Sequence, residues 1–157
     1  MPEASYAELT DAERRFVQDH LDAVPLFINS YSPSDSGLPV SLAILDRAFA
    51  AWLKQDVQDN AQINGTIKIV GVRFGQFLVD EVGFRWTVAT DRQGTELAVL
   101  ALPGHGDVLV FPANFVAKRW ERRESDFMVW AFDAIRKQVH QVQATNERQH
   151  RPWWKVW

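Results

Sequence analysis

The sequence predicts an α+β fold, in which a three-stranded antiparallel meander is flanked by N-terminal and C-terminal helices. Three observations predict this class. Apolar residues recur at helical spacing up to residue 82 and again after residue 112. Between these parts, apolar and polar residues alternate, as in a half-buried strand. Helices, then strands joined by short turns, then helices again are typical of an α+β domain.

The first helix is expected to begin at a capping box. Residues 10–13 read Thr-Asp-Ala-Glu, in which the Thr10 hydroxyl can accept from the third helical amide while the Glu13 side chain reaches back to the cap. The sequence predicts that this helix ends near Asp22. Pro25 follows, and the residue before a proline is disfavoured in the α conformation.

A loop and a second helix are expected next. Residues 30–39 are rich in Ser, Pro, Asp and Gly, which favour turns, so they predict an exposed connection. Ser41 is a good N-cap for the helix that follows. Asp46 and Arg47 lie off the apolar stripe of this helix, which makes it strongly amphipathic.

Residues 66–82 are ambiguous between a strand and a helix. The apolar pattern at residues 67–69 could open a strand, but the helical period continues for longer, so we predict a helix. Gly71 and Gly75 would lie on one face of it. Each glycine costs about 1 kcal/mol relative to Ala in a helix interior, so close packing against another element is the expected compensation.

The period-two pattern predicts three strands. They are expected at residues 84–89, 97–102 and 108–111. The turn segments 91–94 and 103–107 separate them, and both contain Gly, which supplies the positive φ that tight turns need. Consecutive strands joined by tight turns form an antiparallel meander.

Two helices are expected after the sheet. Pro112 suits the first position of a short helix, where its missing N–H costs nothing. Ser125 and Asp126 are expected to cap a longer helix that carries apolar residues as far as Val142. We expect one domain over residues 1–157, made of an N-terminal helix and loop, a core and a Trp-rich tail (residues 1–40, 41–143 and 144–157).

The composition is that of a soluble globular protein, with 46% hydrophobic and 24% charged residues. The chain has no Cys, which excludes a disulfide framework and thiolate chemistry. No apolar run approaches the roughly 20 residues that span a bilayer. The N-terminus lacks the basic and apolar pattern of a signal peptide. We therefore expect a cytoplasmic protein.

Charge is divided unevenly along the chain. The net charge of −3 argues against a dedicated nucleic-acid binder. Residues 1–60 hold ten acidic and four basic residues, whereas residues 111–157 hold five acidic and nine basic ones. The favoured interpretation is that the acidic part folds against the basic part, or that both are ordinary solvated faces. The alternative is a surface with an acidic and a basic region that binds a charged partner.

No catalytic or metal-binding constellation is evident. His105 and Asp107 are the strongest catalytic candidates, because His titrates near neutral pH and both lie in a Gly-rich turn. The same residues are also simply a good hairpin turn, which is the favoured interpretation. The four His show no ligand spacing, and no phosphate-binding or dinucleotide-binding loop is present. We therefore expect no metal and no cofactor.

Two segments are candidates for binding. Residues 118–123 combine basic residues with one Trp, which could grip phosphates, although a short amphipathic helix with a solvated basic rim has the same composition. In the tail, Trp153, Trp154 and Trp157 fall within five residues. Because exposed Trp is costly, we expect them to cover the domain's own core or to join a partner or a second copy.

The middle of the chain resembles a bacterial family of uncharacterised domains, domain of unknown function 3806. The similarity runs from Gly71 to Arg119 and is carried by the patterns Gly-x-x-x-Gly-x-x-Leu, Gly-Phe-x-Trp, Gly-x-Glu-x-Ala-Val, Val-Phe-Pro and Lys-Arg. The resemblance implies a bacterial, cytoplasmic α+β domain and supplies no activity, cofactor or catalytic residue. It also makes Trp86, Glu96 and Lys118, together with Arg119, candidate binding positions.

Two functions remain open at this point. The favoured hypothesis is a non-enzymatic protein-binding module, for example an immunity-like protein or an adaptor. It rests on the aromatic excess, the divided charge and the missing catalytic constellation. The alternative is a small-ligand binder or a hydrolase-like enzyme that uses the loop with His105 and Asp107, and Glu96 as a further candidate.

Overall fold

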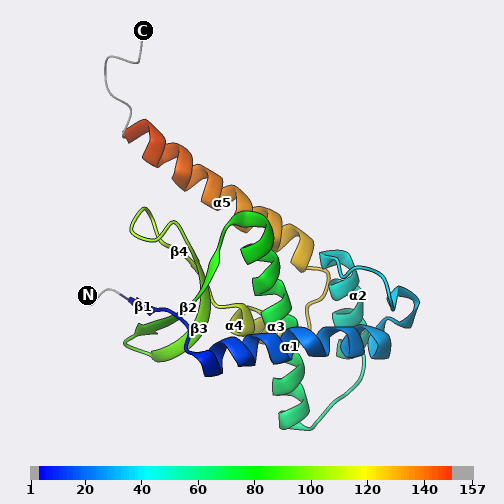
Figure 1. Ribbon diagram of the computed structural model, residues 1–157. Coiled ribbons are helices and arrows are strands. Elements are labelled where there is room, and N and C mark those ends of the chain that lie inside the picture. Colours follow the sequence, from blue (N-terminus) through cyan, green and yellow to red (C-terminus); the bar gives the residue numbers. More distant parts are fainter. Residues whose placement is uncertain (1–3, 150–157) are drawn as a thin grey trace.

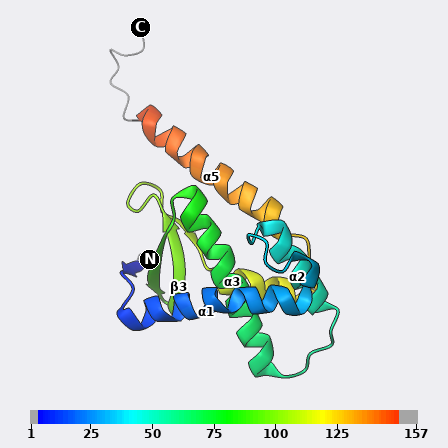
Figure 2. The same ribbon diagram turned by 45° about the vertical axis from the view of Figure 1, so that its right-hand side comes forward.

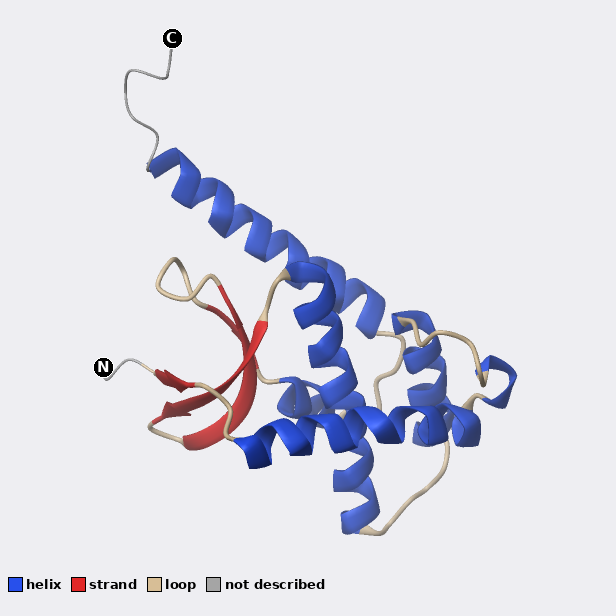
Figure 3. Cartoon of the chain, viewed as in Figure 1, coloured by secondary structure: helices blue, strands red, loops and turns tan. Residues whose placement is uncertain are grey.

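The computed structural model describes residues 4–149, which form a sheet on one side and helices on the other (Figure 3). In chain order (Figure 1), the elements are β1 (Ser5–Ala7), α1 (Asp11–Tyr31), the 3-10 turn η1 (Pro33–Asp35), α2 (Leu42–Leu53), α3 (Asn60–Val82), β2 (Arg85–Asp91), β3 (Gly94–Ala101), β4 (Val108–Val110), α4 (Pro112–Glu121) and α5 (Met128–Gln149). The predicted α+β class is confirmed.

The sheet has four strands rather than the predicted three. Its order is β1-β2-β3-β4, and every neighbouring pair is antiparallel, so the meander β2-β3-β4 is confirmed. The additional strand, β1, is three residues long and pairs Tyr6 with Ala89. The Thr87 hydroxyl also donates to the Ala7 carbonyl at 2.9 Å. So short a segment has no readable period of its own, and pairing with β2 makes it a strand.

Helix α1 has the predicted capping box, but it does not end near Asp22. It continues through Pro25 to Tyr31, so the predicted end was wrong. An interior proline costs about 3 kcal/mol. Val24, Phe27 and Ile28 on either side of it are buried in the core, and burial of such side chains contributes about 1.5–3 kcal/mol each. The stabilisation from packing therefore outweighs the cost of the proline. The first two residues of the predicted loop at 30–39 belong to the helix instead.

Helix α2 begins after Ser41 as predicted, but Asp46 does not lie at the surface. Its side chain is only 5% exposed, and its carboxylate oxygens accept from the Met128 backbone N–H at 3.1 and 3.2 Å. The first turn of α5 is thus capped by a side chain from α2, and not by Ser125 or Asp126 as predicted. Burial raises the pKa of Asp46, an effect that the N–H groups at the start of α5 oppose.

Helix α3 confirms the predicted helix at residues 66–82 and begins earlier, at Asn60, where the Asp59 side chain caps it. The predicted close packing at its glycines is also confirmed. A Cβ at Gly71 would lie 2.8 Å from the Cα of Ala113, and one at Gly75 would lie 2.6 Å from the Trp86 ring. These contacts bring α3 against α4 and β2.

Helix α5 lies across one end of the domain and leads away from it, in the view of Figure 1 and also after the turn shown in Figure 2. Its first residues contact α2. Phe127, directly before α5, makes edge-to-face contacts with the rings of Phe49 and Phe115. Near its other end, the Asn146 side chain donates to the His105 carbonyl at 2.6 Å. Arg148 and Gln149, the last described residues, are exposed.

Candidate functional site

Trp86 on β2 lies where the sheet meets the helices. Its ring packs over Gly75 of α3, and its Nε1 donates to the Gln76 side-chain oxygen at 2.9 Å. The ring is only half-buried, because one part of it also lines two surface hollows. Trp86 is therefore both a core residue and part of the surface.

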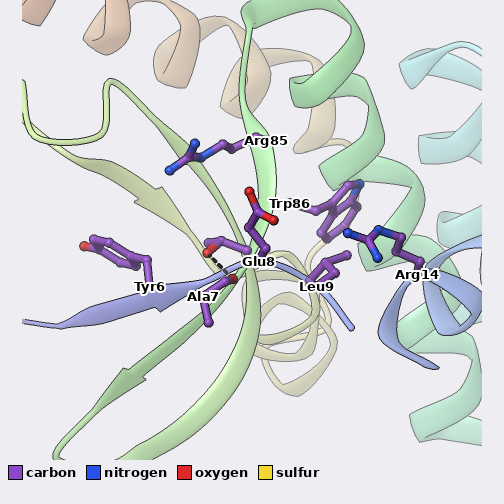
Figure 4. Close-up of a pocket in the computed structure, with 8 residues that line it drawn as sticks. Tyr6, Ala7, Glu8, Leu9, Arg14, Arg85 and Trp86 are labelled. Carbon is purple, nitrogen blue, oxygen red and sulfur yellow. Dashed lines mark hydrogen bonds between the residues drawn. The ribbon is translucent and has the colours of Figure 1, made fainter. Parts of the chain in front are cut away.

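The first of these, the β1 hollow, opens where β1 leaves β2 (Figure 4). It has a volume of about 430 Å³ and is lined by Tyr6, Ala7, Glu8, Leu9, Arg14, Arg85, Trp86 and Thr87. The hollow exists because β1 pairs only with Val88, Ala89 and Thr90, which leaves the first half of β2 without this neighbour. Figure 4 shows two guanidinium groups at it, Arg85 from β2 and Arg14 from α1.

The second, the central hollow, is smaller and mainly apolar. Its volume is about 190 Å³, and it draws its lining from α1, α3, β2, β3 and α4, namely Phe16, Lys68, Val72, Trp86, Glu96, Leu97, Pro112 and Ala113. The tight contacts of Gly71 and Gly75 set the distance between α3 and the start of α4, and so shape this hollow.

The third, the Glu96 hollow, is polar and has a volume of about 220 Å³. It is lined by Ala89, Asp91, Gln93, Gly94, Thr95, Glu96, Phe111 and Asn114. It opens because β4 pairs only with Val99, Leu100 and Ala101, so that the first half of β3 pairs with β2 alone. Trp86 lines both of the first two hollows and Glu96 lines both of the last two, so neighbouring hollows share one lining residue. We call the three hollows together the Trp86 groove.

The charged residues of the groove differ between its two ends. The β1 hollow carries Arg85, Arg14 and Glu8, and Arg14 is paired with Asp11 at 3.1 Å. The Glu96 hollow carries Asp91 and Glu96. Burial and the neighbouring Asp91 raise the pKa of Glu96, and the positive charge of Lys118 opposes this. Of the ion pairs within 4 Å between described residues, none includes Glu96, Arg85 or Lys118. These charges are available to a ligand.

Of the groove residues, only Trp86 and Glu96 were singled out from the sequence, and Lys68 and Phe16 are among those that were missed. Lys68 interrupts the apolar run of α3 and lies over the Phe16 ring, with its Nζ 6.0 Å from the ring centroid. A lone cation in an apolar stretch is a signal that could have been noticed. Nothing in the sequence, however, connects Phe16 to residues 50 positions away.

Residues 47–129 match the family described as domain of unknown function (DUF3806), and this stretch is more than half of the chain. The chain belongs to the DUF3806 family. The resemblance predicted from residues 71–119 is thereby confirmed. Comparisons with curated proteins and with solved structures find no match.

The DUF3806 match includes most of the groove. It runs from Arg47 in α2 to Val129 in α5 and so contains Lys68, Trp86 and Glu96. The parts contributed by β1 and α1, including Phe16, lie outside the matched stretch. The family region therefore supplies the central and Glu96 hollows, to which the N-terminal elements of this chain add one wall.

Arg119 is one of the DUF3806 positions predicted for binding. In the structure its side chain packs between helices and is not among the residues that line the groove. Its guanidinium donates to the Glu124 carboxylate at 2.6 Å and lies 5.0 to 5.6 Å from the ring centroids of Phe115, Phe127 and Trp130. Lys118 beside it is exposed. Arg119 thus ties α4 to α5, whereas Lys118 is free to act on the groove through its charge.

His105 and Asp107 are close in sequence but are not arranged as a catalytic pair. The Asp107 carboxylate accepts from the Gly104 backbone N–H at 2.6 Å, which closes the turn between β3 and β4. Among the described residues, His105 forms its hydrogen bonds through its backbone, and its side chain is exposed. The geometry accounts for both residues as turn chemistry.

We expect His105→Ala to change the free energy of unfolding by no more than about 0.5 kcal/mol, as for an exposed side chain without partners. Thermal unfolding checks this. A panel of ester and phosphoester substrates, compared between the two proteins, tests the enzyme alternative. Hydrolysis by the wild type that His105→Ala loses, with stability unchanged, would establish a catalytic role that the turn geometry does not indicate.

Further observations concern the divided charge, metal ions, membrane spans and the Trp-rich tail. Each ion pair between described residues joins two residues of the same charge segment, so no such pair folds the acidic part against the basic part. In the described part of the chain, no group of three or more His, Asp or Glu could hold a metal ion, and no helix is long and apolar enough to span a bilayer. Trp153, Trp154 and Trp157 lie outside the described residues.

Proposed function

We propose that this DUF3806 domain is a non-enzymatic protein-binding module, of the immunity-like or adaptor type, that holds an extended segment of a protein in the Trp86 groove. The observation that carries the proposal is the central hollow, which joins an apolar lining to unpaired charges of both signs. A bacterial, cytoplasmic setting remains a prediction from the sequence.

The size of the central hollow favours a side chain over a metabolite. Small-molecule sites usually measure roughly 300–1,000 Å³. The central hollow, at about 190 Å³, is below that range and suits one large apolar side chain. Buried aromatic anchors of this kind carry much of the affinity of protein interfaces.

The order of charges defines the class of segment. Asp91 and Glu96 line the Glu96 hollow at one end, and Glu96 also lines the central hollow. Arg85, Arg14 and Glu8 line the β1 hollow at the other end. A segment with a basic residue on one side of its aromatic anchor would place that residue near Glu96. Complementary charges of this kind fix the direction and register of a bound chain.

Leu97→Trp tests the proposal, because Leu97 lines the central hollow and a larger side chain there fills it. Peptides selected from a random library on the wild type are expected to share an aromatic residue next to a basic one. We expect Leu97→Trp to weaken their binding by at least about tenfold, as for loss of an anchor pocket. Isothermal titration measures the affinities.

The matched control is Leu38→Trp, which makes the same exchange at a side chain that is 56% exposed on a separate loop. It should bind the selected peptides like the wild type. The proposal fails if no peptide is enriched, or if the enriched peptides bind Leu97→Trp and the wild type equally well.

A further inference from the structure

We infer that the segment held in the Trp86 groove is the Trp-rich end of a second copy of this chain, residues 150–157, so that two copies exchange these ends. The inference rests on the proposed function, since it names the occupant of the same groove. It is carried by the chemistry of the segment, by the direction of α5 and by the charges of the groove.

The segment has the chemistry that the groove requires. Residues 150–157 read His-Arg-Pro-Trp-Trp-Lys-Val-Trp, with three indoles and two basic residues next to them. An indole of Trp153 or Trp154 provides the large apolar side chain for the central hollow. Arg151 and Lys155 lie on either side of the two Trp, so in either direction one of them provides positive charge for the carboxylates of Asp91 and Glu96. The other comes towards the β1 hollow, where Glu8 is the acidic residue.

Helix α5, which precedes this segment in the chain, leads away from the central hollow of its own copy. Figures 1 and 2 show α5 leading out of the domain, with its C-terminal end far from α1 and α4, whose residues line the central hollow. The Asn146 side chain, bonded to the His105 carbonyl, holds α5 in this direction almost to its end. Arg148 and Gln149, the last described residues of α5, are exposed at the outside of the domain, where a neighbouring molecule can approach.

Exchange of the two ends between two copies would form a closed dimer with two equivalent contacts. A twofold arrangement of this kind uses both grooves and both ends and leaves neither for a third copy. The linkage of the two contacts in one complex also strengthens each of them through a high effective concentration.

The test uses two full-length variants that are complementary. Leu97→Trp blocks the groove and keeps the Trp-rich end. The second variant, Trp153→Ser with Trp154→Ser and Trp157→Ser, keeps the groove and loses the indoles. Sedimentation velocity measures the mass of each protein at concentrations up to about 100 μM, which covers the micromolar affinities of modest interfaces. Leu38→Trp is the control for the groove variant.

We expect the wild type and Leu38→Trp to form dimers, and each complementary variant alone to remain a monomer. An equimolar mixture of the two variants should form a heterodimer through the one intact groove and the one intact end. Its association should be at least about tenfold weaker than that of the wild type, because a single contact lacks the gain from linkage.

Three results would overturn the inference. A wild type that stays monomeric throughout the range excludes exchange. A mixture that does not associate at concentrations about 10⁴-fold above the Kd of the wild-type dimer places the dimer contact elsewhere. A triple Trp variant that dimerises like the wild type removes the segment from the interface. If the wild type is monomeric while selected peptides still bind it and not Leu97→Trp, the groove binds a different protein and the proposed function stands without this occupant.

Discussion

Gly71→Ala is expected to destabilise the domain by about 2 kcal/mol, in spite of the better helix propensity of Ala. A Cβ at this position would lie 2.8 Å from the Cα and 2.9 Å from the backbone nitrogen of Ala113. Backbone atoms cannot rotate away, so α3 and α4 must separate. Overpacking of this kind costs about 1–3 kcal/mol, occasionally more, and the gain in helix propensity offsets at most about 1 kcal/mol.

Gly65→Ala is the matched control for this prediction. Gly65 lies in the same helix, and no atom lies within 4 Å of the position that its Cβ would take. We expect this variant to be more stable than the wild type by about 0.5–1 kcal/mol. Urea unfolding of both variants measures the two effects. Equal changes of one sign in both would show that helix propensity, and not the contact between α3 and α4, dominates at Gly71.

Gly71→Ala should also weaken peptide binding in the groove. The loss of affinity should exceed that of a variant that loses the same stability at a site remote from the groove. The contact between Gly71 and Ala113 sets the position of the start of α4, where Pro112 and Ala113 form one wall of the central hollow. Folded Gly71→Ala that binds the selected peptides with unchanged affinity would show that this wall does not contribute.

Asp46→Ala is expected to cost about 2 kcal/mol of stability, through loss of the cap of α5. The buried carboxylate accepts from the Met128 N–H, and removal of a capping side chain costs about 0.5–2 kcal/mol. In addition, the amide is left without a partner in a buried place. Because this contact joins α2 to α5, the first turn of α5 should lose protection from hydrogen exchange before the rest of the helix.

Asp46→Asn separates the hydrogen bond from the charge. Burial raises the pKa of Asp46, so between the unfolded and the folded value the native state binds more protons than the unfolded state. The pH-dependent part of the contribution of Asp46 to stability is therefore fully present below its unfolded pKa and is lost as the pH rises through the raised folded value, whereas the hydrogen bonds to the Met128 N–H persist.

Asn has no such titration and keeps an acceptor for the amide. Relative to the wild type, Asp46→Asn should gain stability as the pH rises across this window, and at neutral pH it should be at least as stable as the wild type. Chemical unfolding as a function of pH measures this difference. An Asn variant as unstable as Asp46→Ala at every pH would show that the charge itself is needed at the start of α5.

The candidate site was predictable only in part. Trp86 and Glu96 were singled out from the sequence, and the structure places both in the groove. Arg119 was singled out on the same grounds, but its guanidinium lies among Phe115, Phe127 and Trp130. A pattern of residue types marks a position and does not distinguish a basic residue that faces a ligand from one that packs against aromatic rings.

The sequence by itself determined the α+β class, the order of the helices and the meander, and the close packing at Gly71 and Gly75. These features follow from local periodicity, capping and turn chemistry, which act over a few residues. Tertiary structure alone decided the continuation of α1 through Pro25, the pairing of β1 with β2, and the cap of α5 by Asp46. In each case, contacts between residues far apart in the chain outweigh a local preference of a few kcal/mol. A local sequence pattern does not predict such long-range contacts.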